Sequence, residues 1–156
     1  MTPLQDVYDA FLVKMLEDEW ENWTEEEAIM DWYALLLSAL PRFKFPRVDL
    51  TIKEKSYFEG NLSNEEIQIL ATYMKCEWLN RSILTWENVK PLYEERDFSQ
   101  ANLLDKLNAT LEAEKNNAKE LESLYYRSRK GKPFDYSKLA GGNKWHQKLK
   151  KDTTIS

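Results

Sequence analysis

Residues 62–71, Leu-Ser-Asn-Glu-Glu-Ile-Gln-Ile-Leu-Ala, carry the strongest helix-start signal in this chain. Ser63 followed three residues later by Glu66 forms a capping box, in which each side chain bonds the backbone N–H of the other residue. The apolar spacing that follows predicts a helix ending near Arg81, with a buried face of Ile67, Leu70, Ala71, Met74 and Trp78. Its solvent-exposed face is predicted to comprise Glu65, Gln68, Thr72 and Lys75.

Two earlier segments also have helix-start signals. Thr2 precedes a proline and stands three residues before Gln5, which predicts an N-cap for a helix whose apolar stripe reaches Leu16. Thr24 and Glu27 form another capping box, and three glutamates in the first turn favour the positive end of the helix dipole. That second helix is predicted to run to about Leu40 and to stop at the following proline.

The helix predicted over 25–40 is apolar almost all round. Its wider stripe comprises Ala28, Ile29, Trp32, Leu35, Leu36, Ala39 and Leu40, and its second stripe comprises Met30, Tyr33 and Leu37. Such a helix is either central in its own core or covered by a neighbouring subunit. Both readings remain open at this point.

The remaining segments complete an all-α prediction with one exception. Residues 48–52 alternate apolar and polar side chains and suggest one short edge strand. Thr85 could cap a short turn before Pro91, and a long C-terminal helix is expected from Phe98 to about Ser128. The predicted architecture is a bundle of about four helices in residues 1–130, followed by a basic C-terminal arm in residues 131–156.

Composition argues against enzymatic chemistry. The 156 residues include four Gly, one Cys and one His, so a phosphate-binding glycine loop, a disulfide framework and most metal sites are not expected. Cys76 is predicted to be a small buried hydrophobe, and the acidic residues of 17–27 a solvated junction in which Trp20 is a candidate contact residue. No catalytic residue, cofactor or metal is predicted, and no apolar run approaches the roughly 18 residues of a membrane span.

Charge is distributed very unevenly along the chain. Residues 127–156 carry nine basic and two acidic side chains, a net charge of +7, whereas residues 1–126 carry 13 basic and 25 acidic side chains, a net charge of −12. Aromatic residues are interleaved with the basic ones in the arm. The candidate partner-binding residues, in the arm and just before it, are Arg127, Arg129, Lys130, Phe134, Tyr136, Lys144 and Trp145. Docking on an acidic protein, contact with nucleic acid and a merely solvated tail all fit this composition.

The pattern of residues 1–128 resembles the small helical head–tail connector (adaptor) proteins of tailed bacteriophages. The resemblance rests on DVYDAFL at 6–12, the helix over 25–40 ending before Pro41, LSNEEIQILA at 62–71, EWLNR at 77–81 and FSQANLL at 98–104. These motifs are structural, not chemical, in character.

This resemblance implies a non-enzymatic protein of the virion neck. Such proteins bind beneath the portal as a ring, commonly of twelve copies, and extend the DNA channel towards the tail, after assembly in the host cytoplasm. The implied partners are the portal protein, other neck or tail-completion proteins and further copies of the chain, with DNA only as cargo and no membrane. Subunit contacts would then involve Met30, Tyr33, Leu37, Leu121, Leu124 and Tyr125.

A nucleic-acid-binding regulatory protein is the alternative. Its basic tail would contact phosphates, and its affinity would fall steeply as the salt concentration rises. The connector hypothesis instead expects the tail to dock on a protein partner.

Overall fold

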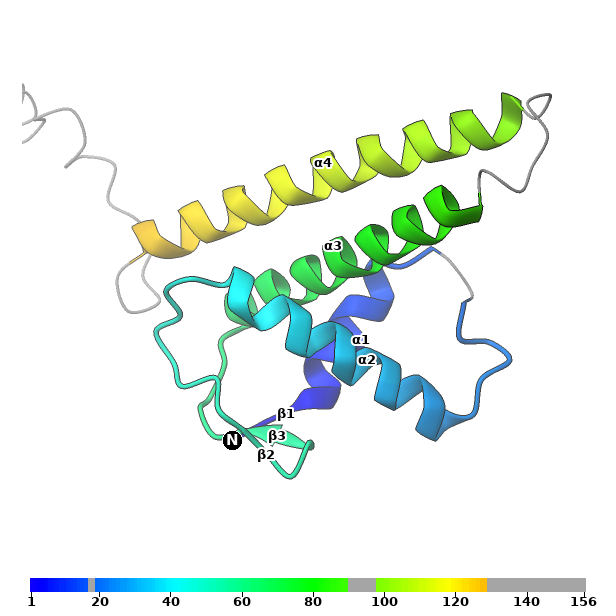
Figure 1. The fold of residues 1–156 in the computed structure, drawn as a ribbon. Coiled ribbons are helices and arrows are strands. Elements are labelled where there is room, and N and C mark those ends of the chain that lie inside the picture. The colour runs from blue at the N-terminus through cyan, green and yellow to red at the C-terminus, as the bar shows by residue number, and fades with distance from the viewer. Residues whose placement is uncertain (17–18, 90–97, 129–156) are drawn as a thin grey trace, which may run out of the picture. The chain divides into compact units, whose positions relative to one another are not determined.

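A computed structural model describes residues 1–16, 19–89 and 98–128 of the chain (Figure 1). Four helices dominate it: α1 (Leu4–Lys14), α2 (Glu25–Ala39), α3 (Asn64–Val89) and α4 (Phe98–Arg127). A 3₁₀ turn, η1 (Leu40–Arg42), follows α2, and three two-residue strands form a small sheet: β1 (Thr2–Pro3), β2 (Ile52–Lys53) and β3 (Tyr57–Phe58). The predicted helical fold class is confirmed.

The chain divides into two compact units after Glu122, and the structure describes residues 123–128 of the second unit. The boundary predicted between residues 130 and 131 lies outside the described residues. Within the first unit, α1 and α2 both pack against α3.

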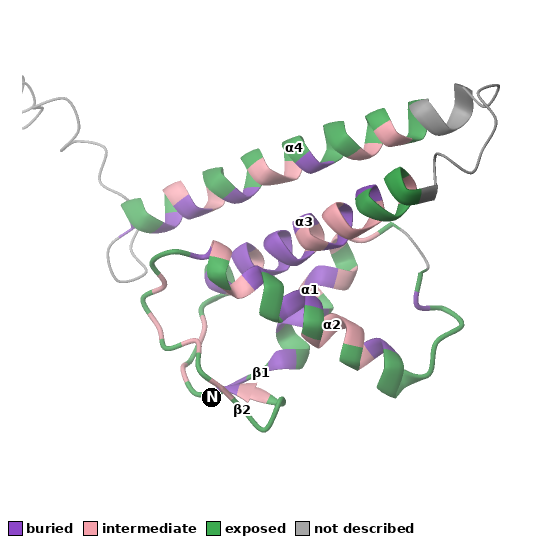
Figure 2. Ribbon diagram, in the orientation of Figure 1, coloured by how far each residue is buried: buried purple, intermediate pink, exposed green. Residues whose placement is uncertain are grey.

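The central element is α3, whose middle turns are largely buried while its two ends are exposed (Figure 2). Its fully or almost fully buried side chains are Glu66, Ile69, Leu70, Ala71, Thr72, Tyr73, Met74, Cys76, Trp78, Leu79 and Ile83. The predicted exposure of Thr72 is therefore wrong. Its hydroxyl donates to the Gln68 carbonyl at 2.8 Å, so the buried oxygen has a partner within its own helix.

Both internal capping boxes are confirmed. The Glu27 amide donates to Thr24 Oγ1 and the Thr24 amide to Glu27 Oε2, each at 3.2 Å. At the start of α3, the Ser63 amide donates to Glu66 Oε1 at 2.8 Å, and the Glu66 amide donates to Ser63 Oγ at 3.3 Å. These bonds satisfy amides that no helical carbonyl can reach.

The predicted end of α3 near Arg81 is wrong, because the helix continues to Val89. Thr85 does not cap a new turn: its hydroxyl donates to the Arg81 carbonyl at 2.9 Å, as threonine does inside a helix. No proline occurs between Arg81 and Val89, so nothing in this stretch breaks the helix.

The N-terminal cap and the single edge strand are also corrected. Thr2 does not cap α1; it lies in β1, where its hydroxyl donates to the Gly60 carbonyl at 3.0 Å and accepts from the Leu62 amide at 2.8 Å. The helix ends at Lys14, before Leu16. The extended segment predicted over 48–52 is a strand only from Ile52, where it begins a hairpin.

The sheet has the order β1-β3-β2, with both pairs antiparallel. Glu54 and Lys55 both adopt positive φ at the turn between β2 and β3, which lets so short a hairpin close. Gly60 follows β3, and a Cβ there would lie 2.7 Å from the Asp49 carbonyl oxygen. Close approach of two backbone segments therefore requires glycine at this position.

Candidate interaction surfaces

Two faces of α2 differ sharply in exposure. Ala28, Leu35, Leu36 and Ala39 are buried and form the face that belongs to the core. On the other side, Met30 is 73% exposed and Leu37 is 45% exposed, while Tyr33 is partly covered, with Lys55 Nζ 5.9 Å from the ring centre. We call Met30, Tyr33 and Leu37 the outer stripe of α2. The central reading of this helix is wrong, because α3 occupies the centre.

A charged cluster joins α2, α3 and the segment between α1 and α2. Asp31 accepts two bonds from the Arg81 guanidinium, from Nη1 at 2.6 Å and from Nη2 at 3.0 Å. It also accepts from Trp20 Nε1 at 2.8 Å. Burial alone would raise the pKa of Asp31, but the hydrogen bonds from Arg81 and Trp20 outweigh it and lower that pKa.

Trp20 is a core residue, and its predicted role as a contact residue is wrong. Its side chain is only 9% exposed, and its ring packs edge-on against Phe11 and Trp32 at centroid distances of 5.7 and 6.1 Å. The indole N–H reaches Asp31, which satisfies the one polar atom of the ring.

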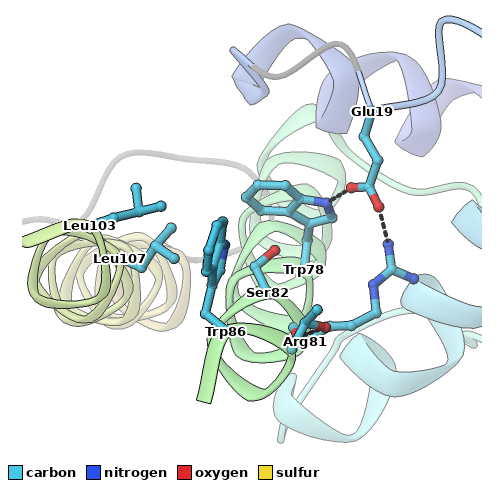
Figure 3. Close-up of a pocket in the computed structure, with 8 residues that line it drawn as sticks. Glu19, Trp78, Arg81, Ser82, Trp86, Leu103 and Leu107 are labelled. Carbon is cyan, nitrogen blue, oxygen red and sulfur yellow. Dashed lines mark hydrogen bonds and ion pairs between the residues drawn. The ribbon is translucent and has the colours of Figure 1, made fainter. Parts of the chain in front are cut away.

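An open groove lies beside this cluster, between α3 and α4 (Figure 3). Its volume is about 450 Å³, and its walls are formed by Glu19, Trp78, Arg81, Ser82, Thr85, Trp86, Leu103 and Leu107. In the figure, Trp86 faces the two leucines of α4, whereas Glu19 accepts hydrogen bonds from Trp78 Nε1 and Arg81. The groove is apolar at one end and ionic at the other, which suits side chains of a protein partner better than an enclosed small molecule.

The sequence alone does not mark Arg81, Asp31 or Trp86 as residues that form these surfaces. Asp31 and Arg81 are 50 positions apart, so no local pattern pairs them. Trp86 stands eight positions after Trp78, which places both on one helical face. This spacing indicates one wall of the groove once α3 continues to Val89, but not the position of α4 opposite it.

The candidate contacts on α4 are not equivalent. Leu124 is 48% exposed and Leu121 is partly exposed. Tyr125 is only 2% exposed and its ring contacts that of Tyr126, so its predicted role in an exposed subunit contact is not supported.

One of the predicted partner-binding residues lies among the described residues. Arg127 is exposed at the last position of α4. The other predicted partner-binding residues lie outside the described residues: Arg129, Lys130, Phe134, Tyr136, Lys144 and Trp145.

The structure gives Cys76 the role of a packed core residue, as predicted. Its side chain is fully buried, and burial raises the pKa of the thiol to about 11, which opposes formation of a reactive thiolate. Across the described residues, no cluster of three or more His, Cys, Asp or Glu side chains is arranged to hold a metal ion. None of the helices in residues 1–16, 19–89 and 98–128 combines the length and hydropathy needed to cross a bilayer.

Comparison of the chain with protein-family models, with curated proteins and with solved structures gives no match.

Proposed function

We propose that this chain is a structural protein of the neck of a tailed bacteriophage, where copies form a ring between portal and tail and extend the DNA channel. The proposal assigns it no catalytic role. It takes its direction from the connector-like sequence pattern of residues 1–128 and from the surface properties of the helical body.

The outer stripe of α2 is the observation that carries the proposal. Met30 and Leu37 are well exposed, although the same helix has a complete buried face and its Thr24 capping box holds its start. The helix is thus fully formed without these side chains being covered. Exposed apolar residues on a well-formed helix are typical of a site that another protein covers.

The charge distribution supports the same function. An acidic inner wall would repel DNA and let it slide without adhering, and residues 1–126 carry a net charge of −12. The basic, aromatic arm would then be available for a protein partner such as the portal.

The test is assembly on the portal. Full-length protein is mixed with portal rings encoded in the same genome, and complexes are examined by size-exclusion chromatography and negative-stain electron microscopy. We expect a ring of density beneath the portal for the full chain. We expect no ring after deletion of residues 131–156, with the melting temperature nearly unchanged.

A paired substitution tests the outer stripe directly. Met30→Ser with Leu37→Ser should reduce ring formation strongly, because it removes exposed apolar area without touching the core. Val13→Ser is the matched control, since Val13 is 84% exposed but lies on α1. If the full chain fails to bind portal rings yet binds duplex DNA with a steep salt dependence, the regulatory alternative replaces this proposal.

A further inference from the structure

A second groove of the first unit is basic, although the surrounding body is acidic. Its volume is about 460 Å³, and it is lined by Pro41, Arg42, Lys44, Tyr73, Lys115 and Lys119. These residues come from η1 and the segment after it, from α3 and from α4. We call it the basic groove.

Internal contacts hold the walls of the basic groove in place. Arg42 forms an ion pair with Glu77 of α3, and the Tyr73 hydroxyl donates to Glu122 of α4. Elsewhere on α3, Lys75 pairs with Glu114 of α4 at 2.9 Å. These contacts fix Arg42 and Tyr73 in the groove, whereas the side chains of Lys44 and Lys119 are exposed.

Three ammonium groups of the groove lack a strong internal counter-charge. Lys44 and Lys119 form no ion pair with any carboxylate of the described residues, and Lys115 has only a 3.9 Å contact with the exposed Glu112. Like charges gathered in one concavity repel one another and attract an anionic ligand. The groove is thus suited to a cluster of carboxylates or phosphates.

The same chain presents such a cluster at the far end of α2. Glu25, Glu26 and Glu27 form its first turn and are all exposed, and the exposed Glu21 precedes them. The basic groove begins at η1, immediately after the last turn of α2. The fifteen residues of α2 therefore separate the two charged surfaces by about 22 Å along the helix axis.

We propose that the basic groove of one copy receives the acidic first turn of α2 from the next copy. This inference rests on the proposed ring function. An antiparallel two-fold dimer would satisfy both surfaces as well, so the choice of head-to-tail contacts, which close a ring when the rotation permits, follows from the proposed ring function and not from the charges alone.

Nucleic acid is the less suitable occupant of this groove. Residues 1–126 carry a net charge of −12, which repels a phosphate backbone over most of the surface that it would have to follow. Each further copy of the chain, by contrast, brings one acidic first turn of α2 for every basic groove. The outer stripe adds the apolar area that a charge pair alone does not provide, because Met30 lies one turn beyond Glu26.

A charge-reversal pair of full-length variants tests the contact. Lys115→Glu with Lys119→Glu makes the groove acidic, and Glu25→Lys with Glu26→Lys makes the first turn of α2 basic; Thr24 and Glu27 are left intact to preserve the capping box. Each variant alone then brings like charges together. We expect each to lose about tenfold or more in self-association, measured by sedimentation velocity at low salt.

Mixing the two variants is the decisive arm of the experiment. Each now offers the surface that the other needs, so an equimolar mixture should recover the association of the unsubstituted protein, and an even-numbered ring can close with alternating copies. Circular dichroism of each variant checks that helicity is retained. Recovery in the mixture cannot come from misfolded chains.

The outcomes separate this inference from the proposed function. If the unsubstituted protein forms rings on the portal and the variants do so equally well, the groove contact is wrong while the neck function stands. If the variants lose association but the mixture does not recover it, the two surfaces do not meet and the inference is overturned. Duplex DNA binding that is lost with Lys115→Glu and Lys119→Glu, without an effect on association, would overturn it in favour of nucleic acid. If the charge reversals behave as expected in solution but no ring forms on any portal, the neck function fails while the contact between copies stands.

Discussion

From composition alone α2 would be expected to be more deeply buried than α3, but the structure shows the reverse. Ten of the fifteen residues of α2 are apolar, against thirteen of the twenty-six of α3, yet α3 is the buried one. The polar residues of α3 find partners: Thr72 bonds within the helix, Lys75 pairs with Glu114, and Arg81 pairs with Asp31. A helix can therefore be buried when its polar side chains have hydrogen-bond or ion-pair partners, and not only when its apolar content is high. The apolar side chains of α2 that the core does not cover form the outer stripe.

The largest difference in stability should be between substitutions of two methionines, the buried Met74 of α3 and the exposed Met30 of α2. Met74 of α3 is fully buried, so Met74→Ala should lower the free energy of unfolding by about 2–5 kcal/mol, through lost burial and the cavity that remains. Urea denaturation followed by circular dichroism measures this. A loss below about 1 kcal/mol would mean that α3 is not the centre of the core.

The charged cluster between the two helices should have the next largest effect. Asp31→Asn should cost about 1–3 kcal/mol at neutral pH, because Arg81 loses the closer of its two carboxylate partners and keeps only Glu19 at 3.4 Å. Asp105→Asn, an exposed site on α4, is the matched control and should change stability little.

The same variant has a defined pH dependence. Because the pKa of Asp31 is lowered in the folded state, its contribution is complete above the ordinary value of 3.8 and is lost as the pH falls through the lower folded value. The difference between Asp31→Asn and the unsubstituted protein should therefore shrink on acidification below about pH 4. A difference that stays constant into the acid range would contradict the ion pair.

The starts of α2 and α3 can be compared directly, because each is stabilised by the same kind of capping box. Thr24→Ala in α2 and Ser63→Ala in α3 each remove the side-chain acceptor of a capping box, and each should cost about 1 kcal/mol. Thermal melting of both variants checks this. A negligible effect at Thr24 alone would indicate that α2 is held by its buried face without help from its cap.

The smallest effect on stability should be at the outer stripe. Met30→Ala should change the free energy of unfolding by less than about 0.5 kcal/mol, because this side chain is 73% exposed. Its effect should appear in assembly instead. A loss of stability comparable to that of Met74→Ala would show that Met30 is covered within its own chain.

The structural features that could be predicted from the sequence are those that depend on residues close together in the chain. The capping boxes at Thr24 and Ser63 join residues three positions apart, and the span of α4 follows from the absence of a helix breaker. The helical fold class follows from these signals together.

Contacts distant in the sequence were beyond such signals. Trp20 reads as a tryptophan in an acidic connection, and only the folded chain brings it to Asp31 and Phe11. Thr2 reads as a helix cap, but its hydroxyl has better-placed partners at Gly60 and Leu62, nearly sixty residues away. Both grooves depend on how α4 lies against α3, which no spacing within either helix specifies.

The pairing of Thr2 with Phe58 has a consequence for the order of folding. Joining these strands closes a loop of more than fifty residues that contains both α1 and α2. The entropic cost of closing this loop is smaller once the two helices have formed and packed, because they bring the two strands closer together. We therefore expect strand pairing to follow docking of the helices, and opening of the small sheet to leave the packing of the helices intact.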